Sequence, residues 1–316
     1  MDIKKKMKRL AIKLIHNLKS VFFLLAYYTV ELPWISYNKY IKKRSIKNCA
    51  INYPIIDLID FNGIEFLIYF ENKGIIEELI LKEGFYEGEI LKIADGFIQE
   101  KTVIIDVGAN IGFESLYFAR KYPGCLVYSY EPASLAYRCL HKSREINSLS
   151  NLKLFKFGVG DSCGQMEIHA PTASTYNKGL ASIPNNCDLD DTFVKEKIEI
   201  VTLDDHVQEP LRVSFIKIDV QGFESKVLKG ALGLIEKNRP VIIFEHSDQY
   251  YEHPLEERKK IQALFSSLDY EFYLIRSGLR KRPYTFLEKI DLVSEKENNG
   301  NLAALPGGFS TERFKK

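Results

Sequence analysis

Acidic residues stand at or just after the ends of five predicted strands. They are Asp106, Glu131, Asp161, Asp219 and Glu245. Ligands of open α/β sheets bind outside the carboxyl ends of the strands, where the strand order reverses, so we expect these side chains along one edge of a sheet. Burying a carboxylate costs several kcal/mol unless it is paired or hydrogen-bonded. The pattern therefore indicates a ligand with many hydrogen-bond donors and a positive charge.

A glycine-containing turn, Asp106-Val-Gly-Ala-Asn-Ile-Gly112, follows the first of these strands. Glycine lets the backbone come close to a ligand. A dinucleotide-binding turn, Gly-x-Gly-x-x-Gly, would need glycine where this chain has Asn110 and Phe113, so a nicotinamide dinucleotide is disfavoured. The residues expected to shape a different nucleoside pocket are Asp106, Gly108, Ala109, Asn110 and Gly112.

The carboxylate of Glu131 ends the second strand, nineteen residues beyond Gly112. A carboxylate in this place can accept two hydrogen bonds from a ribose diol. The alternative is an acid that only stabilises the start of the following helix. Read with the turn, Glu131 favours S-adenosylmethionine (SAM), a cationic, hydroxyl-rich nucleoside without a pyrophosphate.

Strands and helices alternate along most of the chain, which predicts a mostly parallel sheet with helices on both faces. The strands are expected at 102–106, 126–131, 152–159, 215–219 and 241–245, and the helices at 111–121, 133–147, 223–238 and 255–268. Segments 270–275 and 301–305 would complete a seven-stranded sheet, with an antiparallel edge.

Two further regions flank or interrupt this domain, which we place at 101–310. Residues 51–100 read as a lead-in with a hairpin at 60–70, turned by Asn62-Gly63, and helices at 74–81 and 84–99. An insertion at about 161–201 contains strand-like alternation at 166–169 and 198–201. The polar loop between them, at 171–191, is long enough to predict a functional position at the rim of the active site.

The first 50 residues form a basic extension. Twelve Lys or Arg residues against two acidic residues give residues 1–47 a charge of +10, which leaves −8 for the rest of this +2 chain. Such an arm suits a membrane surface or a nucleic acid, and the alternative is a solvated terminus. The apolar stretch 21–30 is too short to span a membrane and predicts an amphipathic helix that packs on the body or lies at an interface.

Five unpatterned cysteines indicate reduced thiols. With a signal peptide disfavoured by the long basic start, we expect a cytoplasmic protein with peripheral contact at the inner face of the membrane.

Several segments together resemble FkbM-family methyltransferases. They are Val103-Ile-Ile-Asp-Val-Gly-Ala-Asn-Ile-Gly-Phe-Glu-Ser115, Tyr130-Glu-Pro132, Thr202-Leu-Asp-Asp205, Ile216-Lys-Ile-Asp-Val-Gln-Gly-Phe-Glu224, Val227-Leu-Lys-Gly-Ala231 and Tyr86-Glu87. The resemblance covers about residues 80–310. It implies a Rossmann-like class I methyltransferase fold, SAM as cofactor and usually O-methylation of sugars or secondary metabolites. One departure is Gln221, where the family often has Glu, and this excludes a proton-transfer role for that side chain.

The resemblance also implies residue roles. Asp106, Gly108, Asn110 and Gly112 would shape the methionine and ribose pocket, Glu131 would hold the ribose, and Gly160 and Asp161 would flank the adenine. Asp161 could equally be a turn residue. Tyr86, Glu87 and Gln221 would lie at the substrate rim, and Asp219 beside the transferred methyl group.

A hydroxyl acceptor must lose a proton, so a base within reach accelerates the reaction. The candidates are Asp219, Glu245 and His246, the last because histidine titrates near neutral pH. His246 could instead only pack or cap, and Glu224 could only stabilise its helix start. A magnesium ion between Asp219 and Glu245 stays an alternative, although no metal is expected.

The leading hypothesis is a SAM-dependent O-methyltransferase whose acceptor is a sugar hydroxyl on a glycan or glycolipid precursor, or a small molecule. A nucleic-acid methyltransferase is the first alternative, but the body is acidic and lacks an Asn-Pro-Pro-aromatic site for a flipped base, so nucleic acid is not expected as a partner. A non-catalytic scaffold with the same fold is the second. No oligomeric state is predicted.

Overall fold

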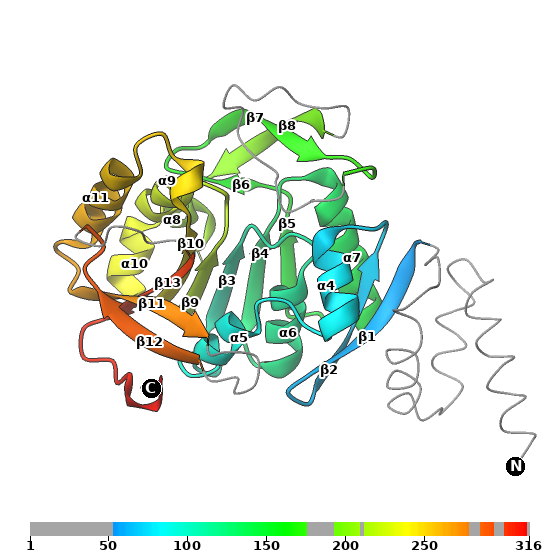
Figure 1. Ribbon diagram of the computed structural model, residues 1–316, viewed down its shortest axis with the longest axis horizontal. Coiled ribbons are helices and arrows are strands. Elements are labelled where there is room, and N and C mark those ends of the chain that lie inside the picture. The colour runs from blue at the N-terminus through cyan, green and yellow to red at the C-terminus, as the bar shows by residue number, and fades with distance from the viewer. Residues whose placement is uncertain (1–52, 176–192, 209–211, 278–284, 294–299, 315–316) are drawn as a thin grey trace, which may run out of the picture. The chain divides into compact units, whose positions relative to one another are not determined.

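The computed structural model describes residues 53–175, 193–208, 212–277, 285–293 and 300–314 (Figure 1). Within these ranges an eight-stranded central sheet has the order β12-β11-β13-β10-β9-β3-β4-β5. Its strands are β3 (Val103–Val107), β4 (Leu126–Tyr130), β5 (Leu152–Phe155), β9 (Val213–Ile218), β10 (Val241–His246), β11 (Tyr270–Ser277), β12 (Thr285–Ile290) and β13 (Gly300–Pro306).

Five adjacent strands, from β5 to β10, run parallel, whereas β13 is antiparallel to both β10 and β11. The expected parallel sheet with an antiparallel edge is therefore confirmed. The seven expected strands are all present, and β12 adds an eighth by pairing antiparallel with β11.

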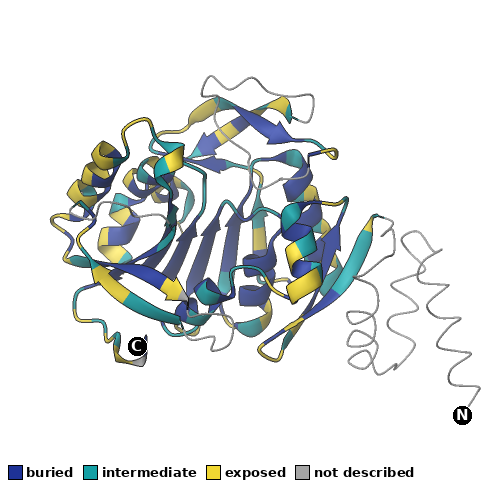
Figure 2. Cartoon of the chain, in the orientation of Figure 1, coloured by how far each residue is buried: buried dark blue, intermediate teal, exposed yellow. Residues whose placement is uncertain are grey.

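Helices cover both faces of this sheet, which explains why every residue of β3 and β9 is buried (Figure 2). On one face lie α4 (Ile75–Glu83), α5 (Gly88–Ala94), α6 (Phe113–Lys121) and α7 (Ser134–Asn147). On the other lie α8 (Leu203–His206), α9 (Glu224–Lys229), α10 (Leu232–Asn238) and α11 (Pro254–Phe265). Two 3-10 turns, η1 (Asp248–Tyr250) and η2 (Glu312–Phe314), complete the described elements.

The predicted hairpin is formed by β1 (Ile55–Phe61) and β2 (Ile64–Phe70). Asn62 and Gly63 both have positive φ, at 54° and 79°, as the two-residue turn requires. The hairpin packs against α6 and α7, and the Asn147 side chain bonds both the N–H and the carbonyl of Leu67, at 2.7 and 2.6 Å. The lead-in therefore belongs to the same hydrophobic core as the sheet.

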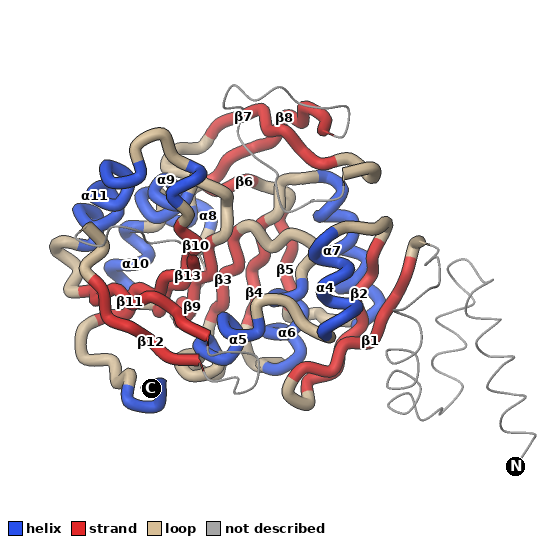
Figure 3. The backbone as a smooth tube through the Cα atoms, in the orientation of Figure 1, coloured by secondary structure: helices blue, strands red, loops and turns tan. Residues whose placement is uncertain are grey.

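The third predicted strand, 152–159, is two strands in different sheets (Figure 3). β5 ends at Phe155, and β6 (Gly158–Val159) pairs with β8 (Phe193–Val201), which pairs in turn with β7 (Gly164–Pro171). The strands expected within the insertion are confirmed by β7 and β8. The loop between them lies mostly outside the described residues, as does the basic extension at 1–50.

The helix predicted over 223–238 is interrupted between α9 and α10. A Cβ atom on Gly230 would lie 1.9 Å from the carbonyl oxygen of Gly160, so the backbone approaches too closely there for any side chain. The chain between α9 and α10 therefore packs directly against the segment that follows β6. The helix predicted at 84–99 is also shorter, since α5 spans only Gly88–Ala94. None of the helices in the described part of the chain is both long and apolar enough to cross a membrane.

Candidate active site

A cavity opens at the carboxyl ends of β3, β4 and β9, where the strand order reverses between β3 and β9. It contains about 1100 Å³ of empty space, its open mouth included. Its lining includes Tyr86, Gly108, Ala109, Asn110, Gly112, Glu114, Glu131, Phe157, Met166, Ile168, Ile198, Ile200, Lys217, Asp219, Gln221 and Phe223. This is the place where open α/β folds bind ligands.

The turn after β3 is held against the end of β9. The N–H of Asp219 donates to the carbonyl of Val107 at 2.9 Å. Gly108 has a φ of 79°, and a Cβ atom there would lie 1.8 Å from the Asp219 carbonyl oxygen. The first glycine is therefore required by this contact between strand ends. Gly112 begins α6 with a φ of 90° and packs closely on Leu140.

Glu131 connects that turn to the next helix and lines the cavity. Its Oε2 accepts from the N–H of Asn110 at 2.9 Å, and its Oε1 accepts from the N–H of Ala133 at 2.8 Å. The side chain is buried, and burial raises its pKa to about 7 despite the two N–H donors. Because each carboxylate oxygen has two acceptor sites, Glu131 can still bind a diol. The helix-start role and the ribose role are therefore compatible, and the ribose role stays a prediction.

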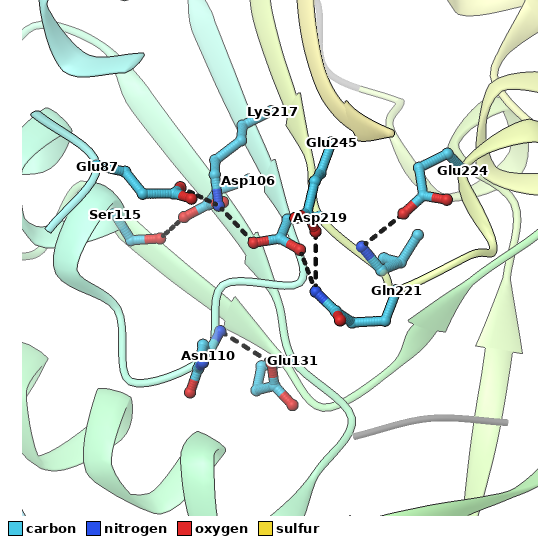
Figure 4. A network of polar contacts seen from close by, with 11 residues as sticks. Glu87, Asp106, Asn110, Ser115, Glu131, Lys217, Asp219, Gln221, Glu224 and Glu245 are labelled. Carbon is cyan, nitrogen blue, oxygen red and sulfur yellow. Dashed lines mark hydrogen bonds and ion pairs between the residues drawn. The ribbon is translucent and has the colours of Figure 1, made fainter. Parts of the chain in front are cut away.

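A buried lysine lies at the centre of several carboxylates that the structure brings together (Figure 4). We call this set the carboxylate cluster: Glu87, Asp106, Glu114, Asp219 and Glu245 around Lys217. The Lys217 side chain is 4% exposed, and its Nζ lies 3.4 Å from Asp219 Oδ2 and 3.9 Å from Glu87 Oε2. Burial alone would lower the pKa of Lys217, but the surrounding carboxylates raise it well above its usual value.

Lys217 and Glu114 were not predicted as site residues from the sequence. A lysine within an otherwise apolar strand, two residues before an acid on the same face, was the signal for Lys217. Glu114 is buried at the start of α6, and burial raises its pKa to about 7.

Asp106 does not line the cavity, which corrects its expected role as a pocket residue. It is fully buried and accepts a hydrogen bond from the Ser115 hydroxyl on α6. Ser115 also bonds the hydroxyl of Ser129 on β4 at 2.6 Å. Asp106 therefore links the sheet to α6 and faces Lys217, and burial raises its pKa.

Gln221 joins two carboxylates from neighbouring strands. Its Nε2 donates to Asp219 Oδ1 at 3.0 Å and to Glu245 Oε2 at 2.9 Å. Burial, followed by the charge of Asp219, raises the pKa of Glu245 to about 7. Gln221 therefore holds the two carboxyl groups together.

Glu224 holds the backbone of the loop that carries Gln221. Its carboxylate accepts from the N–H groups of Val220 and Gly222, at 3.3 and 3.0 Å, and from the Tyr251 hydroxyl. Gln221 has a φ of 53° and Gly222 one of 97°. Glu224 thus does more than begin α9, because it fixes the strained loop beside Asp219.

Six predicted site residues are absent from the cavity lining: Asp106, Glu87, Gly160, Asp161, Glu245 and His246. The Oδ2 of Asp161 forms an ion pair with Lys229 Nζ at 2.9 Å, and the N–H of Gly160 donates to the carbonyl of Val201, which favours the turn alternative for Asp161 over a contact with the adenine. His246 has a fully buried side chain whose Nε2 lies 3.2 Å from Asp248 Oδ1. Its ring stacks on Tyr251, which favours the packing alternative over a proton-transfer role.

The side chains of Tyr86 and Glu87, which are adjacent in sequence, have different surroundings. Tyr86 lines the cavity, and burial followed by the charge of Glu87 raises its pKa. Glu87 has a φ of 46°, and its carboxylate lies on Lys217 instead of in the lining. Burial raises the pKa of Glu87 well above its usual value.

An apolar wall that the sequence analysis did not single out completes the cavity. It combines the inner face of the small sheet with two aromatic rings, from Met166, Ile168, Ile198, Ile200, Phe157 and Phe223. The alternation in β7 and β8 was its only signal. Such a surface suits a flat, apolar group. Among the described residues, no group of three or more His, Cys, Asp or Glu side chains is placed to hold a metal ion.

Comparisons with known proteins identify the family of the chain. The profile of a family described as the methyltransferase FkbM domain matches residues 106–272, more than half of the chain. The chain is 30% identical to methyltransferase sdnD of Sordaria araneosa over 191 residues, which cover 52% of this chain and 72% of that protein. It is 29% identical to the 2-O-methyltransferase NoeI of Sinorhizobium fredii over 159 residues, covering 46% and 64%.

Among solved structures, the chain is similar to the FkbM methyltransferase of Methylobacillus flagellatus. The sequence identity is 17%, the TM-score is 0.41, and the match covers 72% of this chain and 52% of that one.

Proposed function

The chain belongs to the FkbM family of methyltransferases, and from this membership we propose that it methylates a hydroxyl oxygen with SAM as the methyl donor. The observation that carries the proposal is a single cavity, at the switch point of the sheet, lined by both Glu131 and Asp219. We assign Glu131 to the ribose and Asp219 to the reacting group.

The residues of the cavity fit SAM. Glu131 has free acceptor sites for the ribose hydroxyls, and the apolar wall suits adenine. Two acids of the carboxylate cluster, Glu114 and Asp219, line the cavity and would face the sulfonium and ammonium charges, which in turn favour the ionised form of a buried carboxyl group. Two buried acceptor atoms of lining residues, Glu114 Oε1 and Gln221 Oε1, have no protein partner and would be satisfied by ligand donors.

Proton removal from the acceptor falls to the pair Asp219 and Glu245. When bound, SAM supplies an electrophilic methyl carbon, whose bond to sulfur breaks as the bond to oxygen forms, leaving a neutral thioether. Asp219 lines the cavity and would receive the hydroxyl proton. Glu245 and Gln221 would keep it in position. Much of the rate would come from holding the two reactants together.

The acceptor class is proposed from the family resemblance and from the relative NoeI, a 2-O-methyltransferase. We propose a sugar hydroxyl on a glycan or glycolipid precursor. Contact of the basic segment 1–47 with an anionic membrane, at the cytoplasmic face, is part of this proposal and falls on residues outside those described. Co-sedimentation with anionic vesicles, lost on deletion of residues 1–47, is the expected result.

The main test is transfer of labelled methyl from SAM into a cell extract, with the product separated into lipid, glycan and nucleic-acid fractions. Label is expected in glycan or lipid, and it should be lost with Asp219→Asn. The matched control is Asp161→Asn, an acid outside the cavity, which should retain transfer. Label in nucleic acid would overturn the acceptor class, and no labelled product would contradict the activity.

A further inference from the structure

The two carboxylate oxygens of Asp219 contact different donors. One donor lies on β9 and the other lies in the loop after β9. Oδ2 lies 3.4 Å from the ammonium of Lys217, and Oδ1 accepts from Gln221 Nε2 at 3.0 Å. Both of these contacts suit an ionised carboxylate, because the ammonium has no lone pair and the amide nitrogen only donates. The remaining partner of Asp219 is the carboxyl group of Glu245, with which it forms a side-chain hydrogen bond that needs one proton between them.

Glu245 has a different environment. Its Oε2 shares the Gln221 amide with Asp219, and no lysine or arginine in the described part of the chain forms an ion pair with it. Two carboxylates this close cannot both ionise readily. Since Lys217 lies beside Asp219, the negative charge is favoured on Asp219 and the proton on Glu245.

We propose that Lys217 is the positioning residue that determines which member of the pair acts as the base: it keeps Asp219 ionised and turned toward the acceptor, with Glu245 as the protonated partner. The inference rests on the proposed function. Nothing is oxidised or reduced, since the proton of the acceptor hydroxyl passes to Asp219 and leaves to solvent after transfer.

Several other titratable groups surround the pair Asp219 and Glu245. The titratable groups that face Asp219 are Lys217 on β9, Asp106 on β3, Glu114 on α6, Glu131 after β4, Glu224 on α9, Glu245 on β10, Tyr250 on η1, and Tyr86 and Glu87 before α5. Lys217 is the only cation in this set. Lys217 is therefore the cation whose removal tests the arrangement.

The first test is the pH dependence of methyl transfer. In Lys217→Met, the acid limb of the kcat/KM profile should move at least about one pH unit higher, because an adjacent cation typically displaces a carboxyl titration by one to three units. At pH 6 kcat should fall about tenfold or more, while KM for SAM changes less than about threefold. Lys217→Arg should restore the wild-type profile, and Lys229→Met, at an exposed lysine outside the cavity, is the matched control.

A second readout needs no acceptor. Protein labelled with ¹³C at the aspartate carboxyl carbons is titrated by NMR, with Asp219 assigned from Asp219→Asn. The Asp219 resonance should titrate at higher pH in Lys217→Met than in the wild type, and Lys217→Arg should match the wild type. If Lys217→Met does not fold, Lys217→Met/Glu87→Gln removes one charge of each sign and gives the same readout.

Identical Asp219 titrations with and without Lys217 would overturn the inference, whatever the activity. A shifted titration in a protein that transfers no methyl group would instead support the inference and contradict the proposed function.

Discussion

The backbones of Gly108 and Asp219 are in direct contact at the point where β3 and β9 diverge. The Asp219 carbonyl oxygen occupies the space that a Gly108 side chain would need, 1.8 Å from an ideal Cβ atom. The proposed base and the turn proposed to hold the cofactor are therefore positioned by one backbone contact.

This contact predicts that Gly108→Ala destabilises the protein by about 2–5 kcal/mol. The left-handed backbone costs alanine about 1–2 kcal/mol, and the overlap with Asp219 adds about 1–3 kcal/mol. Thermal unfolding should show a Tm about 5–15 °C lower. Gly164→Ala is the control, because its Cβ would meet nothing within 4 Å. Equal Tm values for the two variants would contradict the rigid contact.

The position of Glu131 predicts a specific loss of cofactor binding. Glu131→Gln should weaken SAM binding about 10- to 100-fold in calorimetry, because a hydrogen bond to a charged group is worth about 1.5–3 kcal/mol. Asp161→Asn should bind SAM normally, since it pairs with Lys229 outside the cavity. Unchanged affinity in Glu131→Gln would remove the ribose role.

The buried carboxyl groups predict that stability falls as pH rises. The pKa values of Glu114, Glu131 and Glu245 are raised to about 7 by burial, above the ordinary 4.5. Their contribution is fully present below pH 4.5 and is lost as pH rises through about 7. We expect Tm to decrease by about 5–10 °C between pH 5.5 and 8. Glu114→Gln should flatten this slope, and a slope equal to that of the wild type would argue against it.

The small sheet predicts a contribution to nucleoside binding. Ile198→Ala should weaken SAM binding about tenfold, because each buried methylene group is worth about 0.8 kcal/mol. Ile198 lines the cavity, whereas Val194 on the same strand is exposed. Val194→Ala should therefore leave the affinity unchanged. Equal affinities for the two variants would mean that the wall does not contact the ligand.

The central sheet could be predicted because its strands are short, β-branched and separated by amphipathic helices of ordinary length. The turn after β3, the Glu131 carboxylate and the Asn62-Gly63 hairpin followed from local chemistry in the same way. β12 could not be predicted, because none of its residues is buried and its apolar residues do not alternate with polar ones.

Other features depend on contacts distant in sequence. The third strand divides after Phe155 because Gly158 and Val159 pair with β8, about forty residues later. Asp161 and Lys229 are similarly brought together only by the fold. Lys217 could not be placed from sequence because a lysine in a buried strand is tolerated only where several carboxylates converge, and these come from four different elements.

The two acids that line the cavity, Glu114 and Asp219, have a consequence for turnover. Loss of the methyl group converts a cationic sulfonium into an uncharged thioether, so the same cavity attracts the reactant more strongly than the spent cofactor. A reactant analogue with a positive charge in place of the sulfonium should therefore compete better than the thioether itself.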